Sequence, residues 1–154
     1  MKEYKFISHS AEETMNFAKK LASYLTNGDT IVLSGELGSG KTKFTEGFLS
    51  YYNLENEISS PTFNIVNEYK KDDINIYHFD VYRLENSDEF YSIGGEEYLS
   101  NGICIIEWGE LIEDALLEEY IKISFEKSEN NENTRILNIR DFGTVLKSSW
   151  IQEL

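Results

Sequence analysis

One eight-residue segment of the chain has the residue types that bind phosphate. Residues 35–42 read Gly-Glu-Leu-Gly-Ser-Gly-Lys-Thr, which matches the pattern G-x-x-x-x-G-K-[ST]. The glycines let the backbone turn so that several N–H groups point at one anion, and a helix that follows presents its positive end to the same anion. In such a loop Lys41 reaches the β- and γ-phosphates, and the Thr42 hydroxyl binds Mg²⁺. The segment predicts a nucleotide site formed by Gly35, Gly38, Ser39, Gly40, Lys41, Thr42 and the backbone N–H of Lys43.

Two carboxylates, Asp80 and Glu107, are the candidates for a metal anchor and for a group that orients water, both of which nucleotide hydrolysis needs. Glu107 ends the apolar run 103–106, and a parallel strand beside the phosphate loop that ends in an acid is a common source of such a group. Asp80 lies near the end of an expected strand, where a carboxylate is well placed to meet a metal. Two plainer interpretations stay open, namely an acid that binds backbone N–H groups near a turn and an acid at a sheet edge.

His78 shares a strand face with Asp80, about 7 Å away, because alternate residues of a strand point the same way. We interpret His78 as a buried sheet histidine that could also support the Asp80 carboxylate.

The surrounding hydrophobic patterns predict alternating strands and helices. Residues 30–34 form an apolar β-branched strand before the loop, and residues 43–49 form an amphipathic helix after it. Ser10 and Glu13 fit a capping box that begins an earlier helix, which residues 27–29 end. The other expected elements are a hairpin of strands 64–69 and 74–82, a strand at 103–107, a short acidic helix at 109–119, and strands 120–127 and 134–140 joined by a polar turn.

These elements predict an α/β architecture. Parallel strands need helical crossovers, and the chain has them before and after residues 30–34. We therefore expect a three-layer P-loop nucleotide-binding fold, with a mainly parallel central sheet extended by antiparallel hairpin strands. Its 154 residues suit one domain spanning 1–154.

Composition narrows the function further. Asp and Glu total 28 against 14 Lys and Arg, and the resulting net charge of −14 opposes unaided binding to nucleic acid. No apolar run approaches the roughly 20 residues of a membrane span, and the N-terminus has no signal-peptide pattern. We expect a cytoplasmic protein that does not enter membranes. Cys104 is the one cysteine, so an internal disulfide is impossible, and its apolar neighbours indicate a buried, reduced thiol.

Four blocks of the chain, in order, resemble the TsaE family, also called YjeE. They are the phosphate loop, Ser60-Pro61-Thr62-Phe63, the segment 77–84 that reads Tyr-His-Phe-Asp-Val-Tyr-Arg-Leu, and Ile106-Glu107-Trp108. The resemblance implies an ATP-hydrolysing subunit that uses ATP and Mg²⁺. It would support N6-threonylcarbamoyladenosine modification of tRNA together with TsaB and TsaD, and would meet tRNA only through that complex.

The resemblance also implies roles for single residues. Lys41 becomes the phosphate-binding lysine, Thr42, Asp80 and Glu107 become the magnesium ligands, and the two acids become essential for catalysis. Trp108 matches a tryptophan that the family needs for function. The other implied nucleotide contacts are Thr62 in a switch-like loop, Thr14 on the first helix and Arg135 in the last hairpin.

Three other classes of protein share part of this pattern. A GTPase needs an N-K-x-D motif and a D-x-x-G switch, and neither occurs in the sequence. A small-molecule kinase usually closes an arginine-bearing lid over the phosphoryl group, which the three scattered arginines make difficult. A nucleotide-gated binding module without useful turnover shares every motif of the ATPase, so the sequence leaves it open.

Overall fold

The architecture comes from a computed structural model that describes residues 2–36, 38–58, 65–82, 84–116 and 119–143. Its strands are β1 (Lys2–Ser8), β2 (Thr30–Ser34), β3 (Val66–Lys71), β4 (Ile74–Asp80), β5 (Ile103–Glu107), β6 (Ile121–Lys127) and β7 (Arg135–Asp141). Its helices are α1 (Ala11–Ala22), α2 (Lys41–Ser50), α3 (Ser87–Ser92) and α4 (Gly95–Asn101), with 3₁₀ helices η1 (Glu55–Glu57) and η2 (Gly109–Ala115).

The strands of these described ranges form one seven-stranded sheet in the order β1-β7-β6-β2-β5-β4-β3. Its centre is parallel, because β2 pairs in parallel with both β6 and β5, and β5 pairs in parallel with β4. The outer pairs are antiparallel: β7 with β6 and β1, and β3 with β4. This confirms the expected parallel centre extended by two hairpins.

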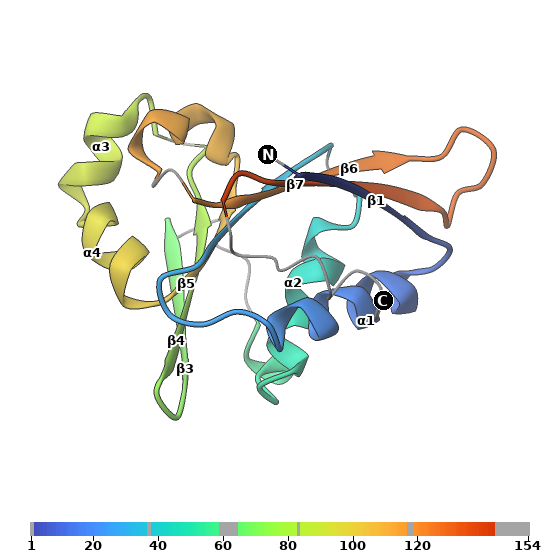
Figure 1. Ribbon diagram of the computed structural model, residues 1–154, viewed down its shortest axis with the longest axis horizontal. Helices are drawn as coiled ribbons and strands as arrows, with labels where there is room; N and C mark the ends of the chain where they lie inside the picture. Colours follow the sequence, from blue (N-terminus) through green and yellow to red (C-terminus); the bar gives the residue numbers. More distant parts are fainter. Residues whose placement is uncertain (1, 37, 59–64, 83, 117–118, 144–154) are drawn as a thin grey trace.

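Helices cover both faces of the sheet, which confirms the three-layer architecture (Figure 1). One apolar core joins the sheet to α1 and α2, and the other joins it to α3, α4 and η2. The alternation along β4 matches this division, since Ile76 belongs to the first core and Phe79 to the second. Cys104 is buried in the second core, as expected, and burial raises the pKa of its thiol to about 12. Within the described part of the chain, no helix has the length and apolarity that crossing a bilayer requires.

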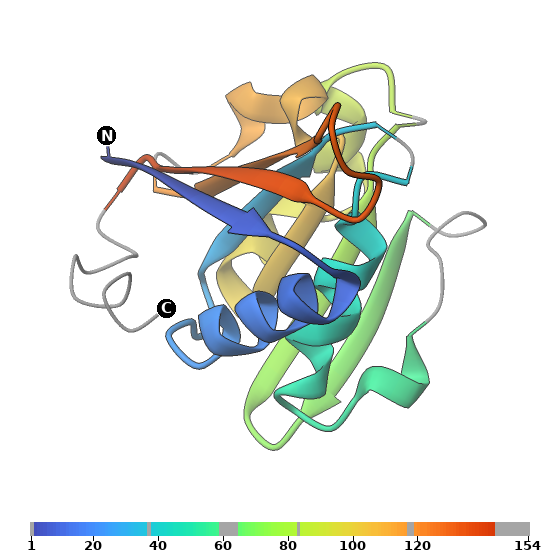
Figure 2. The same cartoon turned by 90° about the vertical axis from the view of Figure 1, so that its right-hand side faces the viewer.

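The helices α1 and α2 lie side by side in both views (Figures 1 and 2). They are in tight contact at Gly47, where an added Cβ would stand 2.3 Å from the carbonyl oxygen of Met15 and 2.5 Å from its Cα. Both atoms belong to the backbone, so a side chain cannot move aside to relieve the clash. Glycine at this position therefore sets how closely α2, and the loop before it, sits against α1.

Replacement of Gly47 by Ala is expected to destabilise the fold by about 1–3 kcal/mol, because overpacking outweighs the better helix propensity of alanine. Urea unfolding measures the change as a lower midpoint. Glu46→Ala, at a partly exposed site on the same turn, is the control and should cost at most about 0.5–1 kcal/mol. Equal midpoints for the two variants would contradict this account of the helix contact.

The expected element boundaries need several corrections. The hairpin turn is shorter than residues 70–73, because Lys70 and Lys71 continue β3 and Asp72 adopts φ 53° in a tight connection. The expected helix at 109–119 is a 3₁₀ helix that ends at Ala115 and has a non-helical residue, Ile112, inside it. β1, α3 and α4 were not predicted from the sequence.

The expected capping box is present with altered partners. The Ser10 hydroxyl accepts a hydrogen bond from Glu13 N at 3.1 Å, as a cap does. The Glu13 carboxylate, however, accepts from the backbone N–H of His9 instead of that of Ser10. The helix start is therefore fixed by both side chains.

Candidate functional site

The phosphate-loop sequence forms the connection between β2 and α2, so strand, loop and helix follow one another as expected. Gly40 precedes the helix with φ 112°, a left-handed conformation that other residues rarely adopt. No side chain caps this helix end, and its first turn carries no acidic residue. The unpaired N–H groups and positive dipole end of α2 are thus available to an anion.

The loop packs against the β6–β7 hairpin. Gly35 lies against Phe125, and Ser39 is buried beside it. On the outer side, the Arg135 Nη2 donates to the carbonyl oxygen of Gly38 at 3.4 Å. The hairpin therefore packs against the loop and places the Arg135 guanidinium at the outer edge of the loop.

The two candidate acids lie together at the carboxyl ends of neighbouring parallel strands. Asp80 of β4 stands directly opposite Glu107 of β5 in the register. Both lie on the α1–α2 face of the sheet, since each follows the alternation of first-core residues on its strand. The strand order places β5 beside β2 and β4 beside β5, and this brings both acids next to the phosphate loop.

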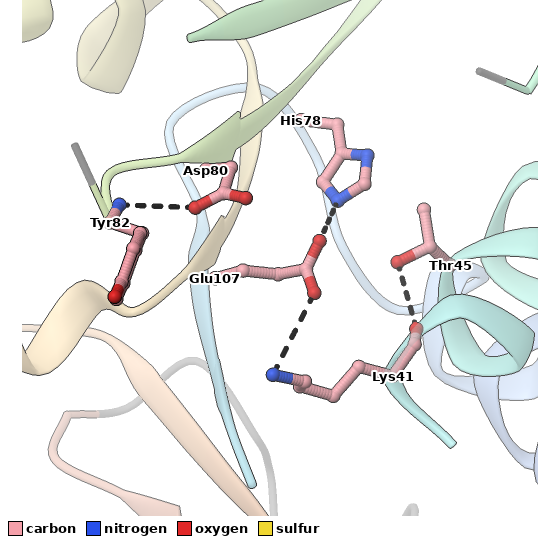
Figure 3. Close-up of polar contacts among 6 residues, drawn as sticks. All are labelled: Lys41, Thr45, His78, Asp80, Tyr82 and Glu107. Carbon is pink, nitrogen blue, oxygen red and sulfur yellow. Dashed lines mark hydrogen bonds and ion pairs between the residues drawn. The ribbon is translucent and has the colours of Figure 1, made fainter. Parts of the chain in front are cut away.

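The Glu107 carboxylate lies between a lysine and a histidine (Figure 3). Its Oε1 is 3.9 Å from the Nζ of Lys41, and its Oε2 is 2.8 Å from the Nε2 of His78. All three side chains are largely buried; the most exposed, that of Glu107, is 15% accessible. Lys41 of the phosphate loop therefore faces the Glu107 carboxylate.

The Asp80 carboxylate makes the backbone contact that its plainer interpretation predicted. Its Oδ1 accepts a hydrogen bond from Tyr82 N at 3.0 Å. The residue is only partly buried and stands next to Glu107 in the sheet. Asp80 therefore makes a turn contact and also lies at the candidate site.

Trp108 follows β5 with φ 66°, an uncommon conformation for a residue other than glycine. The centre of its ring is 5.0 Å from Lys41 Nζ, within the range of a cation–π contact. Its ring also lies 5.1 Å from that of Tyr82. The indole thus borders both the loop lysine and the segment that follows Asp80.

The oxygen donors present suit magnesium. Thr42 is exposed at the start of α2, and Asp80 and Glu107 supply carboxylates, all ligand types that Mg²⁺ prefers. In the described ranges, no group of three or more His, Cys, Asp or Glu side chains could hold a metal ion. Mg²⁺ commonly keeps several waters and uses one or two carboxylates together with substrate phosphates, so two acids and a hydroxyl fit it.

The other expected nucleotide contacts fall in different places. Thr14 is buried, and its hydroxyl hydrogen-bonds that of Ser8 at 2.7 Å. The Lys43 side chain is exposed and pairs with Glu46 at 3.2 Å. Thr62, with its neighbours 59–64, lies outside the described residues. The structure therefore brings Lys41, Glu107, Asp80, Trp108 and Arg135 around the loop but gives Thr14 an interior partner.

Lys127 lies at the site although no motif marked it, and His78 contacts a different acid from the one expected. Lys127 pairs in register with Arg135 across the β6–β7 hairpin, and its Nζ would be 3.5 Å from a Cβ on Gly38. The expected hairpin register could have revealed it. His78 is buried in the sheet, as expected, but its Nε2 hydrogen-bonds Glu107 on the neighbouring strand, whereas the expected contact was with Asp80.

Comparison with known proteins agrees with the observed fold. Residues 8–137 match the family model described as "Threonylcarbamoyl adenosine biosynthesis protein TsaE". A relative from Rickettsia conorii, named tRNA threonylcarbamoyladenosine biosynthesis protein TsaE, is 42% identical and covers 80% of this chain and 71% of its own. The protein of that name from Bacillus subtilis is 39% identical over 86% of this chain and 83% of its own. A crystal structure of Bacillus subtilis YdiB superposes with a TM-score of 0.75 at 31% identity, covering 99% of this chain and 93% of that one.

Proposed function

This chain belongs to the TsaE family of tRNA threonylcarbamoyladenosine biosynthesis, and from that premise we propose that it binds Mg·ATP and hydrolyses it. One observation carries the proposal. Lys41, at the start of α2, faces Glu107 at 3.9 Å, and Asp80 stands beside Glu107 in the sheet. A phosphate loop opposite two strand-end acids is the arrangement that nucleoside triphosphate hydrolysis uses.

The proposed mechanism assigns a role to each of these residues. Lys41 and the loop N–H groups balance the charge that develops on the γ-phosphate. Thr42 and Asp80 would hold Mg²⁺, which would supply positive charge that neutralises the phosphates. Glu107 either completes the metal coordination or orients the attacking water. To meet the phosphates, Lys41 turns away from Glu107 and from the Trp108 ring.

The family resemblance supplies the proposed partners, TsaB and TsaD. Arg135 stands at the loop rim, near Gly38, and the described residues place no arginine beside Glu107. P-loop enzymes that lack an inserted arginine turn over slowly, and a cation from a partner can accelerate them by about 10³-fold or more. We therefore propose slow turnover by this chain alone and stimulation by the partners.

With a net charge of −14, the chain is proposed to meet tRNA only through its partners. We also propose a cytoplasmic location and a single ATPase domain over residues 1–154.

The test is ATP turnover measured with the chain alone, with TsaB and TsaD, and with tRNA added. Phosphate release that rises on addition of the partners supports the proposal. ATP binding without turnover in every mixture would instead identify a nucleotide-gated binding module. Transfer of the phosphoryl group to an added metabolite would identify a kinase.

Trp108→Ala is expected to lower partner-stimulated turnover by about 30-fold, the effect of losing one 2 kcal/mol aromatic anchor at an interface. ATP affinity should change only about fivefold, because Lys41 is buried, the indole is half-buried, and a single cation–π contact between the exposed and desolvated limits contributes about 1 kcal/mol. Steady-state kinetics with and without TsaB and TsaD measure the first effect, and calorimetry measures the second.

Tyr91→Ala is the matched control, because it removes an exposed aromatic ring from α3 at 42% accessibility. It should leave stimulation unchanged. Equal stimulation of Trp108→Ala and the unaltered chain would remove Trp108 from the partner contact.

A further inference from the structure

We propose that His78 is a positioning residue that holds the Glu107 carboxylate in its working orientation. The inference rests on the proposed ATPase function and adds a residue to that site. His78 touches no expected ligand group, so it would act only through Glu107.

The sheet register places the two side chains within reach of each other. His78 stands opposite Ile105, and Glu107 follows two residues later on the same face of β5. The imidazole spans this diagonal, and its Nε2 lies 2.8 Å from Glu107 Oε2. An ionised carboxylate can only accept a hydrogen bond, so Nε2 is the nitrogen that carries the hydrogen.

Burial argues against a role in packing alone. His78 is 3% exposed, and among the described residues its Nδ1 has no hydrogen-bond partner. A buried polar atom without a partner costs free energy that an apolar side chain would avoid. Ile76, two residues earlier on the same strand face, shows that this side of β4 accepts such a side chain. The bond to Glu107 is what the histidine provides and an apolar residue would not.

The bond becomes more important when Lys41 is engaged elsewhere. Among the described residues, Glu107 contacts two side chains, with His78 on one oxygen and Lys41 at 3.9 Å from the other. In the proposed reaction Lys41 turns to the phosphates, which leaves His78 to fix the carboxylate. A hydrogen bond to an ionised group is short and directional, and a misplacement of about 1 Å at a reacting group can cost about 10²-fold in rate.

The test compares His78→Leu with His78→Gln in the full chain, with TsaB and TsaD present. His78→Leu should lower kcat by about 10²-fold while the ATP dissociation constant stays within about twofold, since only orientation is lost. The Gln side chain still offers an N–H donor and should restore much of kcat. His9→Gln, at the exposed second histidine, is the control and should change neither value.

A spectroscopic measurement on the chain alone tests the bond independently of turnover. Long-range ¹H–¹⁵N correlations should show the hydrogen of His78 on Nε2, and Glu107→Ala should shift that nitrogen while leaving His9 unchanged. The proposal is overturned if His78→Leu keeps full kcat, if it loses ATP affinity as much as kcat, or if Nε2 is insensitive to Glu107. Absence of turnover in the unaltered chain with its partners would overturn the ATPase function instead, and the ¹⁵N spectrum would still decide whether His78 binds Glu107.

Discussion

Lys41→Ala should weaken Mg·ATP binding by at least about 100-fold, the effect of truncating one partner of a buried, hydrogen-bonded charge pair. Lys41 is 8% exposed and begins α2, so its ammonium meets any phosphate bound at that helix end without competition from bulk water. The variant also removes the positive charge that screens the Glu107 carboxylate from the phosphates. Both consequences act against the same ligand.

Thr42→Ala should weaken binding through the metal alone. Its hydroxyl is exposed at the loop, so the loss should appear in the presence of Mg²⁺ and vanish with a chelator. Calorimetry with and without Mg²⁺ separates the two variants. Lys19→Ala, an exposed lysine on α1, controls for the loss of a positive charge. Unchanged affinity in both loop variants would mean that residues 35–42 are not a phosphate site.

Glu107→Gln should still bind ATP but lose turnover by at least about 10²-fold, as expected when a group that acts mainly in the transition state is removed. Glutamine keeps the shape of the side chain and can still accept the hydrogen bond from His78, so the fold should be intact. Single-turnover kinetics in the complex with TsaB and TsaD would measure the loss.

Asp80→Asn provides the comparison for the second acid. It should require more Mg²⁺ for half-maximal turnover, because one carboxylate ligand becomes a neutral amide. A Mg²⁺ titration of both variants distinguishes a metal ligand from a water-orienting group. If both variants hydrolyse ATP at the normal rate in the assembled complex, neither acid takes part in catalysis.

The parts of the fold that the sequence predicted are those with strong local signals. Residues 30–34 and 103–107 are short runs rich in β-branched residues that became β2 and β5 with the same bounds, because both strands are buried from either side. β1 was not predicted because it occupies a sheet edge and its exposed residues include Lys2, Glu3 and Lys5. α3 and α4 are only six and seven residues long, and helices of that length depend on tertiary packing.

The residues of the site divide in the same way: those in a contiguous motif could be predicted, and contacts between residues far apart in the sequence could not. The loop residues could be predicted because the motif is contiguous and its glycines are needed by the backbone. The contact between Glu107 and His78 could not, because 29 positions separate them and only the pairing of β4 with β5 brings them together. Lys127 could have been predicted, because the expected hairpin register places it opposite Arg135, although its approach to Gly38 depends on how the hairpin packs against the loop.

The parallel register between β4 and β5 also constrains which changes of chain length this site can survive. Deleting one residue between Ile76 and His78 would shift the pairing by one and turn His78 and Asp80 toward α3 and α4. The buried Phe79 would then point toward the phosphate loop. By contrast, insertions between the end of β4 and Gly102 fall in the crossover that joins β4 to β5. The length of this crossover does not set the register between the two strands. Evolutionary gain and loss of residues should therefore be tolerated in that crossover and excluded from seven consecutive positions of β4.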